Sequence, residues 1–383
     1  MKRSNAGYIW RDGNQFELLI DGQLYFQRML QTLEAAEDTI LLEMYLFESG
    51  VVANQFIRAF CDAADRGVAV YLLLDDYGCT RLKVSDRQKL ERRNISFLLY
   101  NPIRLPHVKR ALLRDHRKLL IVDSSIAFVG GTGITDQFSS AVKHDRAWRD
   151  TMVQISGPCV LDWLHLFKHT WDEVATDSRL NIVAKESAPV AGEMLGRVTC
   201  SDSLGRREIK RSFIKRIRNA EHTIWIATAY FVPSMKIRRA LIQAARNGVD
   251  VRLLLPGKHT DHPAVRHAGR RFYYSLLNAG VRVFEYQPRF THSKVLMCDV
   301  WVSIGSSNFD RWNMRWNLEA NQEIEDGQLV KDVMAMLQAD FEQSKEVLLG
   351  EWRNIPWYHR LAIWFWGRID IWLDRLTHGW RKK

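Results

Sequence analysis

The chain has 383 residues, of which 46% are apolar, and a formal net charge of +11 at pH 7. This length allows two domains of ordinary size, and the positive charge favours a polyanionic neighbour, either nucleic acid or an anionic membrane surface. The five cysteines lie far apart without CxxC or CxxH spacing, which argues against a zinc site and a disulfide framework and is typical of a reducing cytoplasm.

No targeting or membrane-spanning segment is predicted. The basic first residues, MKRSNAGYIWRDGNQ, are not followed by an apolar core, so we expect no signal peptide. No stretch approaches ~18 uninterrupted apolar residues, so we expect no spanning helix.

The first half of the chain alternates strands and helices. After residues 36–40 an apolar strand runs to Phe47, and an amphipathic helix follows that ends at Gly67, where a C-terminal cap favours a left-handed residue. The run VAVYLLL then predicts a strand covered on both faces. A further helix and strand end at Asn101 and Pro102, and the next strand lies in DHRKLLIVD.

The second half repeats this order. Residues 220–224 lead into a strand that reaches Phe231, and the following helix ends at Gly248 before the strand VDVRLLL. A strand ending at Gln287 and Pro288 precedes THSKVLMCD. We therefore predict an α/β fold of two homologous lobes, each a mixed sheet covered by helices on both faces, related by a pseudo-twofold axis. The predicted boundaries are 1–190 and 191–350 for the lobes and 351–383 for a separate tail.

A His-x-Lys-x4-Asp motif occurs once in each half. The two copies are His116, Lys118 and Asp123, and His292, Lys294 and Asp299. Small-residue turns follow them at 130–132 and 305–308. A single HxK is common by chance, and an α/β duplication could carry incidental histidines, but matched spacing and matched flanks favour a shared site.

Two imidazoles that face each other across one phosphate can exchange a phosphodiester without a metal or another cofactor. One neutral imidazole attacks phosphorus and forms a phosphohistidine, while the other, protonated, donates its proton to the leaving alkoxide. Lys118 and Lys294 share the strand face of the histidines and could neutralise the non-bridging oxygens. Ser306 and Asn308 could donate hydrogen bonds to the same oxygens.

Four carboxylates accompany the motifs. Asp123 and Asp299 belong to the catalytic motif, but their odd spacing places them on the opposite strand face, so we interpret them as structural anchors rather than proton carriers. Asp150 and Glu319 are candidates for orienting the histidines. Spacing alone is equally compatible with surface or capping carboxylates at both positions.

The paired motifs and the run GSSNFDRWNMRWNLEAN resemble the phospholipase D superfamily over roughly residues 14 to 345. The segments LLIDGQLYF, EMYLF and NLEAN are similar to bacterial cardiolipin synthases, especially the shorter B-type members. This resemblance implies a phosphatidyltransferase that passes a phosphatidyl group from one phosphatidylglycerol to another through a histidine and releases glycerol. It also implies that His116 is the nucleophile, that His292 is the acid and base, and that Asp150 and Glu319 are their carboxylate partners.

One position departs from the family pattern. Gly133 stands where the family commonly has an asparagine, so the first half-site loses an amide donor, which Thr132 or Thr135 could replace.

Basic and aromatic residues suggest a lipid surface. A cluster before the first motif could contact lipid phosphates or form a solvated loop; it comprises Arg104, Lys109, Arg110, Arg114 and Arg117. The tail holds six of the 14 tryptophans. As a helix from Leu361 it would gather apolar residues on one face, flanked by Arg368 and Arg375, with Asp370 opposite. Such a helix is typical of a membrane interface, and docking on the protein body is the alternative.

These features together predict phosphatidylglycerol and an anionic membrane surface as partners, with no obligatory nucleic acid and no protein partner indicated. The predicted location is the cytoplasmic side of the cell membrane, as a peripheral protein. The alternatives are a phospholipase D-type hydrolase, a nucleic-acid phosphodiesterase with the same two-histidine chemistry, and an inactive membrane-binding scaffold.

Overall fold

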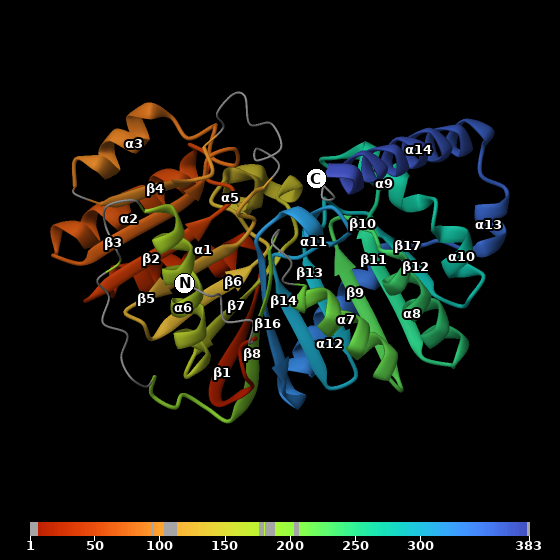
Figure 1. Cartoon of the computed structure of the whole chain (residues 1–383), viewed down its shortest axis with the longest axis horizontal. Helices are drawn as coiled ribbons and strands as arrows, with labels where there is room; N and C mark the ends of the chain where they lie inside the picture. Colours follow the sequence, from red (N-terminus) through yellow and green to blue (C-terminus); the bar gives the residue numbers. More distant parts are fainter. Residues whose placement is uncertain are drawn as a thin grey trace.

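The computed structural model describes residues 7–93, 95–102, 113–175, 180, 188–202 and 207–380 (Figure 1). The first lobe contains, in chain order, β1 (Arg11–Ile20), α1 (Asp21–Glu34), β2 (Thr39–Met44), α2 (Val51–Asp65), β3 (Ala69–Asp75), α3 (Val84–Glu91), β4 (Ser96–Tyr100), β5 (Lys118–Val122), β6 (Ile126–Gly130), α5 (Ser140–Lys143), β7 (Thr151–Ser156) and α6 (Cys159–Val174).

The second lobe repeats this succession. It contains β8 (Met194–Ser201), α7 (Glu208–Asn219), β9 (Thr223–Thr228), β10 (Phe231–Val232), α8 (Met235–Arg246), β11 (Asp250–Pro256), α9 (Pro263–Arg270), α10 (Tyr273–Leu277), β12 (Arg282–Tyr286), β13 (Lys294–Cys298), β14 (Trp301–Gly305), β15 (Phe309–Asp310), α11 (Asn313–Trp316), β16 (Glu319–Glu325) and α12 (Gly327–Glu342). The short strand β17 (Ser344–Glu346) and the helices α13 (Leu349–Arg353) and α14 (Trp357–Trp380) follow.

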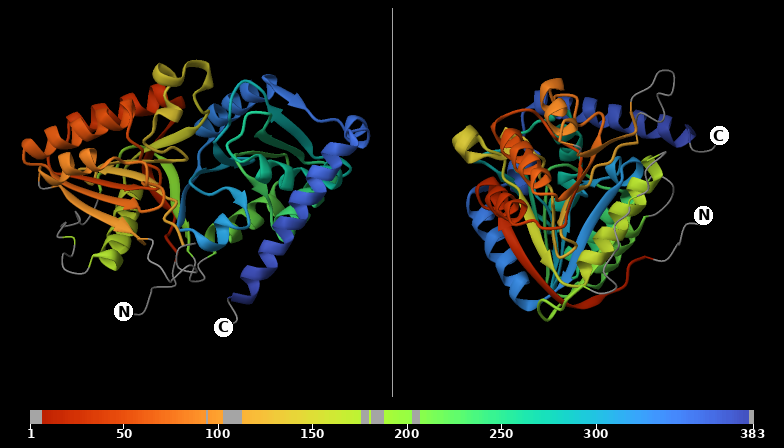
Figure 2. Two further views of the ribbon diagram at one scale, coloured as in Figure 1. Left: turned by 90° about the horizontal axis from the view of Figure 1, so that it is seen from above. Right: turned by 90° about the vertical axis from the view of Figure 1, so that its left-hand side faces the viewer.

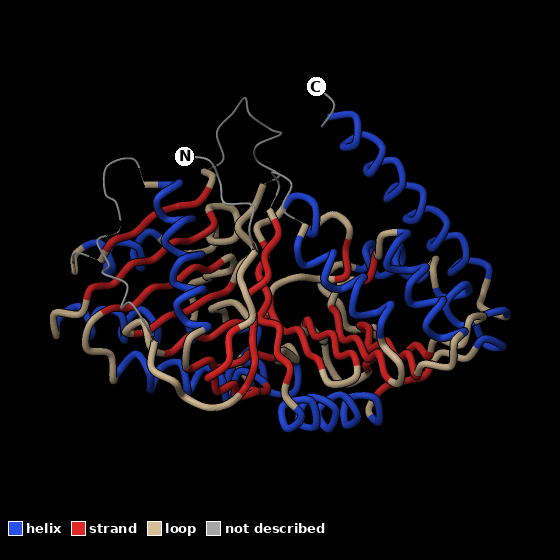
Figure 3. Tube along the Cα trace, turned by 60° about the horizontal axis from the view of Figure 1, so that its bottom comes forward, coloured by secondary structure: helices blue, strands red, loops and turns tan. Residues whose placement is uncertain are grey.

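Apart from β10 and β15, which pair with each other, the strands of both lobes form one 15-stranded sheet, which runs through the molecule as a continuous layer in Figure 3. Its order is β17-β12-β11-β9-β13-β14-β16-β8-β1-β7-β6-β5-β2-β3-β4. From the β8–β1 junction outward the two halves have equivalent orders, which is the arrangement that a pseudo-twofold axis produces. Parallel pairs such as β2–β3 and antiparallel pairs such as β2–β5 make the sheet mixed. The predicted α/β class with two homologous lobes is confirmed, and the two sheets join edge to edge.

Helices cover both faces of this sheet (Figure 2). In each lobe one buried apolar cluster lies on each face, so the central strands have almost no exposed side chains, as the runs VAVYLLL and VDVRLLL predicted. The glycines that follow α2 and α8 adopt left-handed backbone, with φ of 96° at Gly67 and 92° at Gly248. This conformation ends each helix and returns the chain to the sheet.

The tail docks on the second lobe, where α14 lies along α9 (Figure 1). Asp370 faces the body and accepts hydrogen bonds from Arg271 at 2.5 Å, Arg311 at 2.6 Å and the Trp312 indole at 2.9 Å. The other side of α14 leaves large apolar side chains exposed, namely Trp357, Tyr358, Leu361, Trp364, Phe365 and Trp372. One side of the helix is therefore docked and the other is free, while the Arg375 side chain lies outside the described residues. Within the described part of the chain, no helix has the length and apolar character that crossing a membrane requires.

Candidate active site

The two histidines stand where the lobes meet. His116 and His292 each lie two residues before the motif strand, β5 or β13. The backbone N–H of His116 donates to the carbonyl of Leu318 at 3.0 Å, and that of His292 donates to the carbonyl of Arg149 at 2.7 Å. Each bond crosses from one lobe to the other, so the backbone of each histidine is held by the opposite half of the chain.

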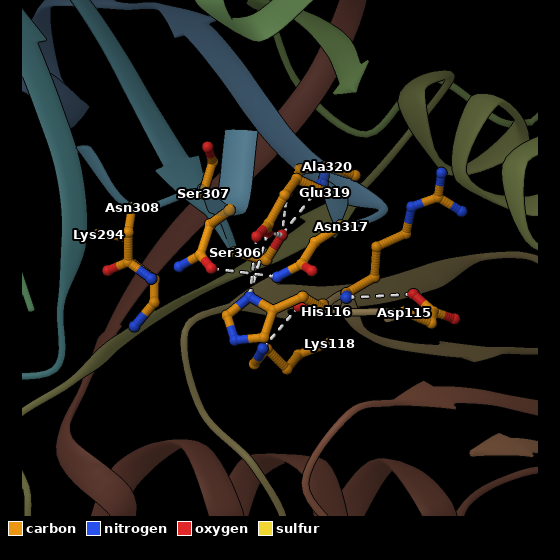
Figure 4. A network of polar contacts seen from close by, with 12 residues as sticks. Asp115, His116, Lys118, Lys294, Ser306, Ser307, Asn308, Asn317, Glu319 and Ala320 are labelled. Atoms are coloured by element: carbon orange, nitrogen blue, oxygen red, sulfur yellow. Dashed lines mark hydrogen bonds and ion pairs between the residues drawn. The ribbon is translucent and has the colours of Figure 1, made fainter. Parts of the chain in front are cut away.

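The imidazole ring of each histidine is likewise bonded to a carboxylate of the other lobe. Nδ1 of His116 lies 3.0 Å from Oε1 of Glu319, and Nδ1 of His292 lies 2.7 Å from Oδ2 of Asp150. Figure 4 shows the first of these pairs. Both carboxylates are fully buried. The residues that precede them, Leu318 and Arg149, are the ones that accept the histidine N–H groups, so one chain segment fixes both the backbone and the ring.

Burial lowers the pKa of both lysines. It lowers the pKa of Lys118 to about 7 and that of Lys294 to about 8. Nζ of Lys118 donates to the His116 carbonyl at 2.6 Å, and Nζ of Lys294 donates to the His292 carbonyl and lies 2.9 Å from Nδ1 of His292. Both ammonium groups are thus beside the rings whose reaction they are expected to assist.

The pKa values of both histidines and of Asp150 differ from the ordinary values of these groups. Burial lowers the pKa of His116, against the opposing effect of Glu319. Burial and the Lys294 charge lower the pKa of His292 well below its usual range, and burial raises the pKa of Asp150 to about 7. A bound phosphodiester anion would raise the pKa of the lysines and imidazoles, because opposite charge favours their protonated forms.

Asp123 and Asp299 lie at the opposite ends of β5 and β13 from the histidines. The Asp123 carboxylate accepts backbone hydrogen bonds of 2.8–3.0 Å from residues 37–39, and the Asp299 carboxylate accepts equivalent bonds of 2.8–3.0 Å from residues 221–223. Each tie fixes the end of a motif strand to the start of its neighbour, β2 or β9. These contacts are those of structural anchors, and neither aspartate lines the cavity that contains both histidines.

The small-residue turns contact the carboxylates of Glu319 and Asp150. The Ser306 hydroxyl donates to Oε2 of Glu319 at 2.5 Å, so its hydrogen is engaged before any ligand arrives (Figure 4). At the equivalent place in the first lobe, a Cβ added to Gly131 would lie 2.5 Å from Oδ1 of Asp150, so glycine lets this carboxylate approach. Among the described residues the buried Nδ2 of Asn308 has no hydrogen-bond acceptor, which leaves this amide available to a ligand.

Gly133 leaves no room for the missing asparagine. A Cβ at this position would lie 2.7 Å from both Cβ and the carbonyl oxygen of Leu46. The hydroxyl of Thr132 donates to Tyr25 at 3.1 Å and that of Thr135 donates to Glu48 at 2.7 Å. Neither threonine therefore presents its hydroxyl in place of the amide.

Both histidines line a single cavity of about 620 Å³. Its wall includes the aromatic residues Tyr45, Phe138, Trp148 and Tyr230, and the acidic residues Glu48, Asp261 and Asp310. The Tyr230 hydroxyl donates to Asp261. These wall residues were not predicted: Tyr45 and Asp310 lie in the quoted segments EMYLF and GSSNFDRWNMRWNLEAN, but local spacing does not show which side chains reach the cavity.

The predicted basic cluster is not a lipid contact at the two positions that can be described. Arg114 and Arg117 are buried, and they pair with Asp75 at 3.5 Å and Glu43 at 3.1 Å. Their charges therefore balance carboxylates beneath the site. Arg104, Lys109 and Arg110 lie outside the described residues.

The model of the family described as "Cardiolipin synthase, PLD-like domain" matches residues 29–171 and 213–343, which covers both motifs and most of both lobes. The chain belongs to this family. It is 33% identical over 358 residues to cardiolipin synthase B of Shigella flexneri, covering 90% of this chain and 86% of that protein. It is 32% identical over 350 residues to cardiolipin synthase A of Pseudomonas entomophila, covering 91% of this chain and 72% of that protein.

A solved structure agrees with this fold. The phosphatidylserine synthase of Haemophilus influenzae superimposes with a TM-score of 0.73 at 12% identity and covers 97% of each chain. At that identity the likeness concerns the fold alone. The predicted membership of the phospholipase D superfamily and the predicted class of enzyme, a phosphatidyltransferase, are confirmed by the family match and the cardiolipin synthase relatives.

Proposed function

We propose that this member of the cardiolipin synthase, PLD-like family joins two phosphatidylglycerol molecules into cardiolipin through a phosphohistidine and releases glycerol. The observation that carries the proposal is the pairing within one cavity of two histidines from different lobes, each bonded through Nδ1 to a buried carboxylate of the other lobe. Those bonds occupy Nδ1 of each ring, so Nε2 is the nitrogen for chemistry at a shared phosphorus; Nε2 of His292 lies 3.1 Å from Nζ of Lys294, which would bind a non-bridging oxygen instead.

In the first step, Nε2 of His116 attacks the phosphorus of one phosphatidylglycerol. Glu319 accepts the Nδ1 hydrogen and stabilises the positive charge that grows on the ring. The phosphorus–oxygen bond to the terminal glycerol breaks as the nitrogen–phosphorus bond forms, and His292 gives the leaving oxygen its proton. The pKa of Asp150 near 7 keeps a proton available to the Asp150–His292 pair at neutral pH.

In the second step, the terminal hydroxyl of another phosphatidylglycerol enters the position that glycerol left. His292 takes its proton, the oxygen attacks phosphorus, and the nitrogen–phosphorus bond breaks to give cardiolipin and free His116. Lys118, Lys294 and the unpaired amide of Asn308 would stabilise the non-bridging oxygens in both steps. Ser306 would act through Glu319.

The acceptor hydroxyl needs its own binding groups, since water at the same position would give phosphatidic acid. We assign this role to Tyr230 and Asp261. A carboxylate beside a phosphate site repels phosphate oxygens but accepts hydrogens from hydroxyl groups. The Asp261 side chain is 20% exposed on the cavity wall, so it can meet a glycerol moiety.

The substrates are membrane lipids, and the exposed apolar side of α14 provides a surface for a bilayer. We therefore also propose a peripheral location on the cytoplasmic side of the cell membrane. None of the proposed steps uses a metal, a nucleotide or a nucleic acid.

The test is incubation of the pure protein with phosphatidylglycerol vesicles and EDTA, followed by resolution of the lipids. We expect cardiolipin and glycerol in equal amounts. Phosphatidic acid as the main product would identify a hydrolase, and an unchanged lipid would leave a nucleic-acid phosphodiesterase or an inactive scaffold.

A further inference from the structure

A second cavity, of about 550 Å³, lies between α9–α10 and α13–α14. We call it the α14 groove. Its apolar surface includes Trp352, Ile355 and Ile363, and five arginines contribute to its lining. None of its lining residues belongs to the catalytic cavity.

Two of these arginines, which belong to the body of the protein, are paired with carboxylates. Arg271 pairs with Asp370 at 2.5 Å and Arg270 pairs with Glu285 at 3.2 Å. The other three, Arg353, Arg360 and Arg368, belong to the tail and are exposed. Within the described part of the chain, none of these three forms an ion pair with a carboxylate.

The contacts of the three tail arginines are weaker. Arg353 lies 6.0 Å from the ring centre of Tyr274, and Arg368 lies 5.7 Å from that of Trp364. Arg360 donates to the backbone carbonyl of Arg353. Three cations without counterions around an apolar hollow repel one another, and a bound anion would relieve that repulsion.

The arginines and the apolar surface of the groove together favour a ligand that carries both a negative charge and a hydrocarbon part. Guanidinium groups bind phosphate through paired N–H donors, and an apolar floor accommodates hydrocarbon. The same helix exposes Trp357, Leu361, Phe365 and Trp372, the residue types that lie at the surface of a bilayer. A phosphate-bearing lipid drawn from that bilayer satisfies the charge and the apolar surface together.

We propose that the α14 groove binds one anionic glycerophospholipid, with its phosphate between Arg353, Arg360 and Arg368 and the start of an acyl chain on the apolar floor. The first half of α9 reaches the catalytic cavity at Val265, whereas its end reaches the groove at Arg270. Five residues of helix span only ~8 Å. A lipid in the groove would therefore hold the mouth of the catalytic cavity close to the bilayer. This inference goes beyond the proposed reaction and does not depend on it.

The test measures binding of dihexanoyl-phosphatidylglycerol, below its micellar concentration, by titration calorimetry. The parent protein is the full chain carrying His116→Ala, which prevents turnover. The groove variant combines Arg353→Gln, Arg360→Gln and Arg368→Gln. The matched control combines Arg211→Gln, Lys215→Gln and Arg218→Gln, which removes the same charge from a basic hollow on α7. All six side chains are exposed, so both variants should fold, and thermal melts check this.

We expect the groove variant to bind one lipid fewer per chain than the parent and the α7 control; with one lipid also in the catalytic cavity, the counts are one and two. Binding to bilayers of phosphatidylglycerol should weaken at least about 30-fold in the groove variant, because one hydrogen bond to a charged group alone contributes roughly 10- to 150-fold. The α7 control should change less than about threefold, and dihexanoyl-phosphatidylcholine and inorganic phosphate should not fill the groove. Equal weakening in both variants, or the same number of lipids bound by the groove variant as by the parent, overturns the proposal. Absence of cardiolipin synthesis would leave it standing.

Discussion

Each histidine is bonded to a carboxylate of the other lobe, so we predict that Asp150 and Glu319 affect different reaction steps. Asp150→Asn should impair the proton transfers of His292, and Glu319→Gln should impair the attack by His116. Each substitution removes a buried hydrogen bond to a charged group, of 2.7 Å for Asp150 and 3.0 Å for Glu319. Such bonds contribute about 1.5–3 kcal/mol, which corresponds to about 10- to 150-fold in rate. Loss of the correct tautomer adds to this factor.

A p-nitrophenyl ester of phosphatidic acid separates the two steps, because p-nitrophenolate leaves without a proton. Formation of the phosphohistidine then needs only the nucleophile, and it appears as a burst of one p-nitrophenolate per chain. With Asp150→Asn the burst rate should stay within about threefold of wild type while the following turnover falls at least about 10-fold. With Glu319→Gln the burst itself should slow at least about 10-fold.

The reverse pattern would refute the assignment of roles, because Asp150 would then serve the nucleophile. Loss of the burst in both variants would refute the separation of steps. Ser306→Ala provides a matched control, since it removes a hydrogen bond to Glu319 and leaves the carboxylate in place. It should slow the burst in the same direction as Glu319→Gln and to a smaller extent.

Three further outcomes follow from the same site. The value of kcat/KM should fall as pH rises through about 7 to 8, because the free site then loses the charges of Lys118 and Lys294; a flat profile from pH 6 to 9.5 would contradict this. Lys118→Met should abolish transfer yet raise the free energy of unfolding at pH 7 by about 1–3 kcal/mol, because burial disfavours this charge. The folded pKa of Lys118 lies below its unfolded value, so wild-type stability should rise from about pH 7 to about 10.5, and denaturant titrations should show a smaller rise in the variant. Asp261→Asn should shift products from cardiolipin toward phosphatidic acid by at least about threefold with donor consumption largely kept, and an unchanged ratio in a lipid assay would remove its acceptor role.

The sequence was sufficient to predict the lobes and the residues of the motifs. Repeated features such as Gly67 and Gly248 report local backbone requirements, and strand periodicity reports burial, so both can be recognised in a single chain. Asp123 and Asp299 were interpreted as structural anchors from their odd spacing to the histidines, and their side chains hold backbone N–H groups at the start of the neighbouring strands.

Contacts between the lobes could not be predicted in this way. His116 and Glu319 are separated by 203 residues, and nothing in their local spacing shows which histidine the carboxylate meets. The same limit applies to Arg114 and Arg117, whose partners Asp75 and Glu43 come from neighbouring strands. In α14, the polar side with Asp370 meets half-buried arginines of the body instead of solvent, a contact that depends on tertiary structure.

Trapping the covalent intermediate tests most directly whether two imidazoles, one from each lobe, act on the same phosphorus. The His292→Ala variant, treated with the p-nitrophenyl ester, lacks the base of the second step, so a phosphatidyl adduct should accumulate and peptide mapping by mass spectrometry should locate it on His116, one per chain. The His116→Ala variant should carry no adduct. An adduct on His292 in that variant, or none on His116 in the first, would contradict the account.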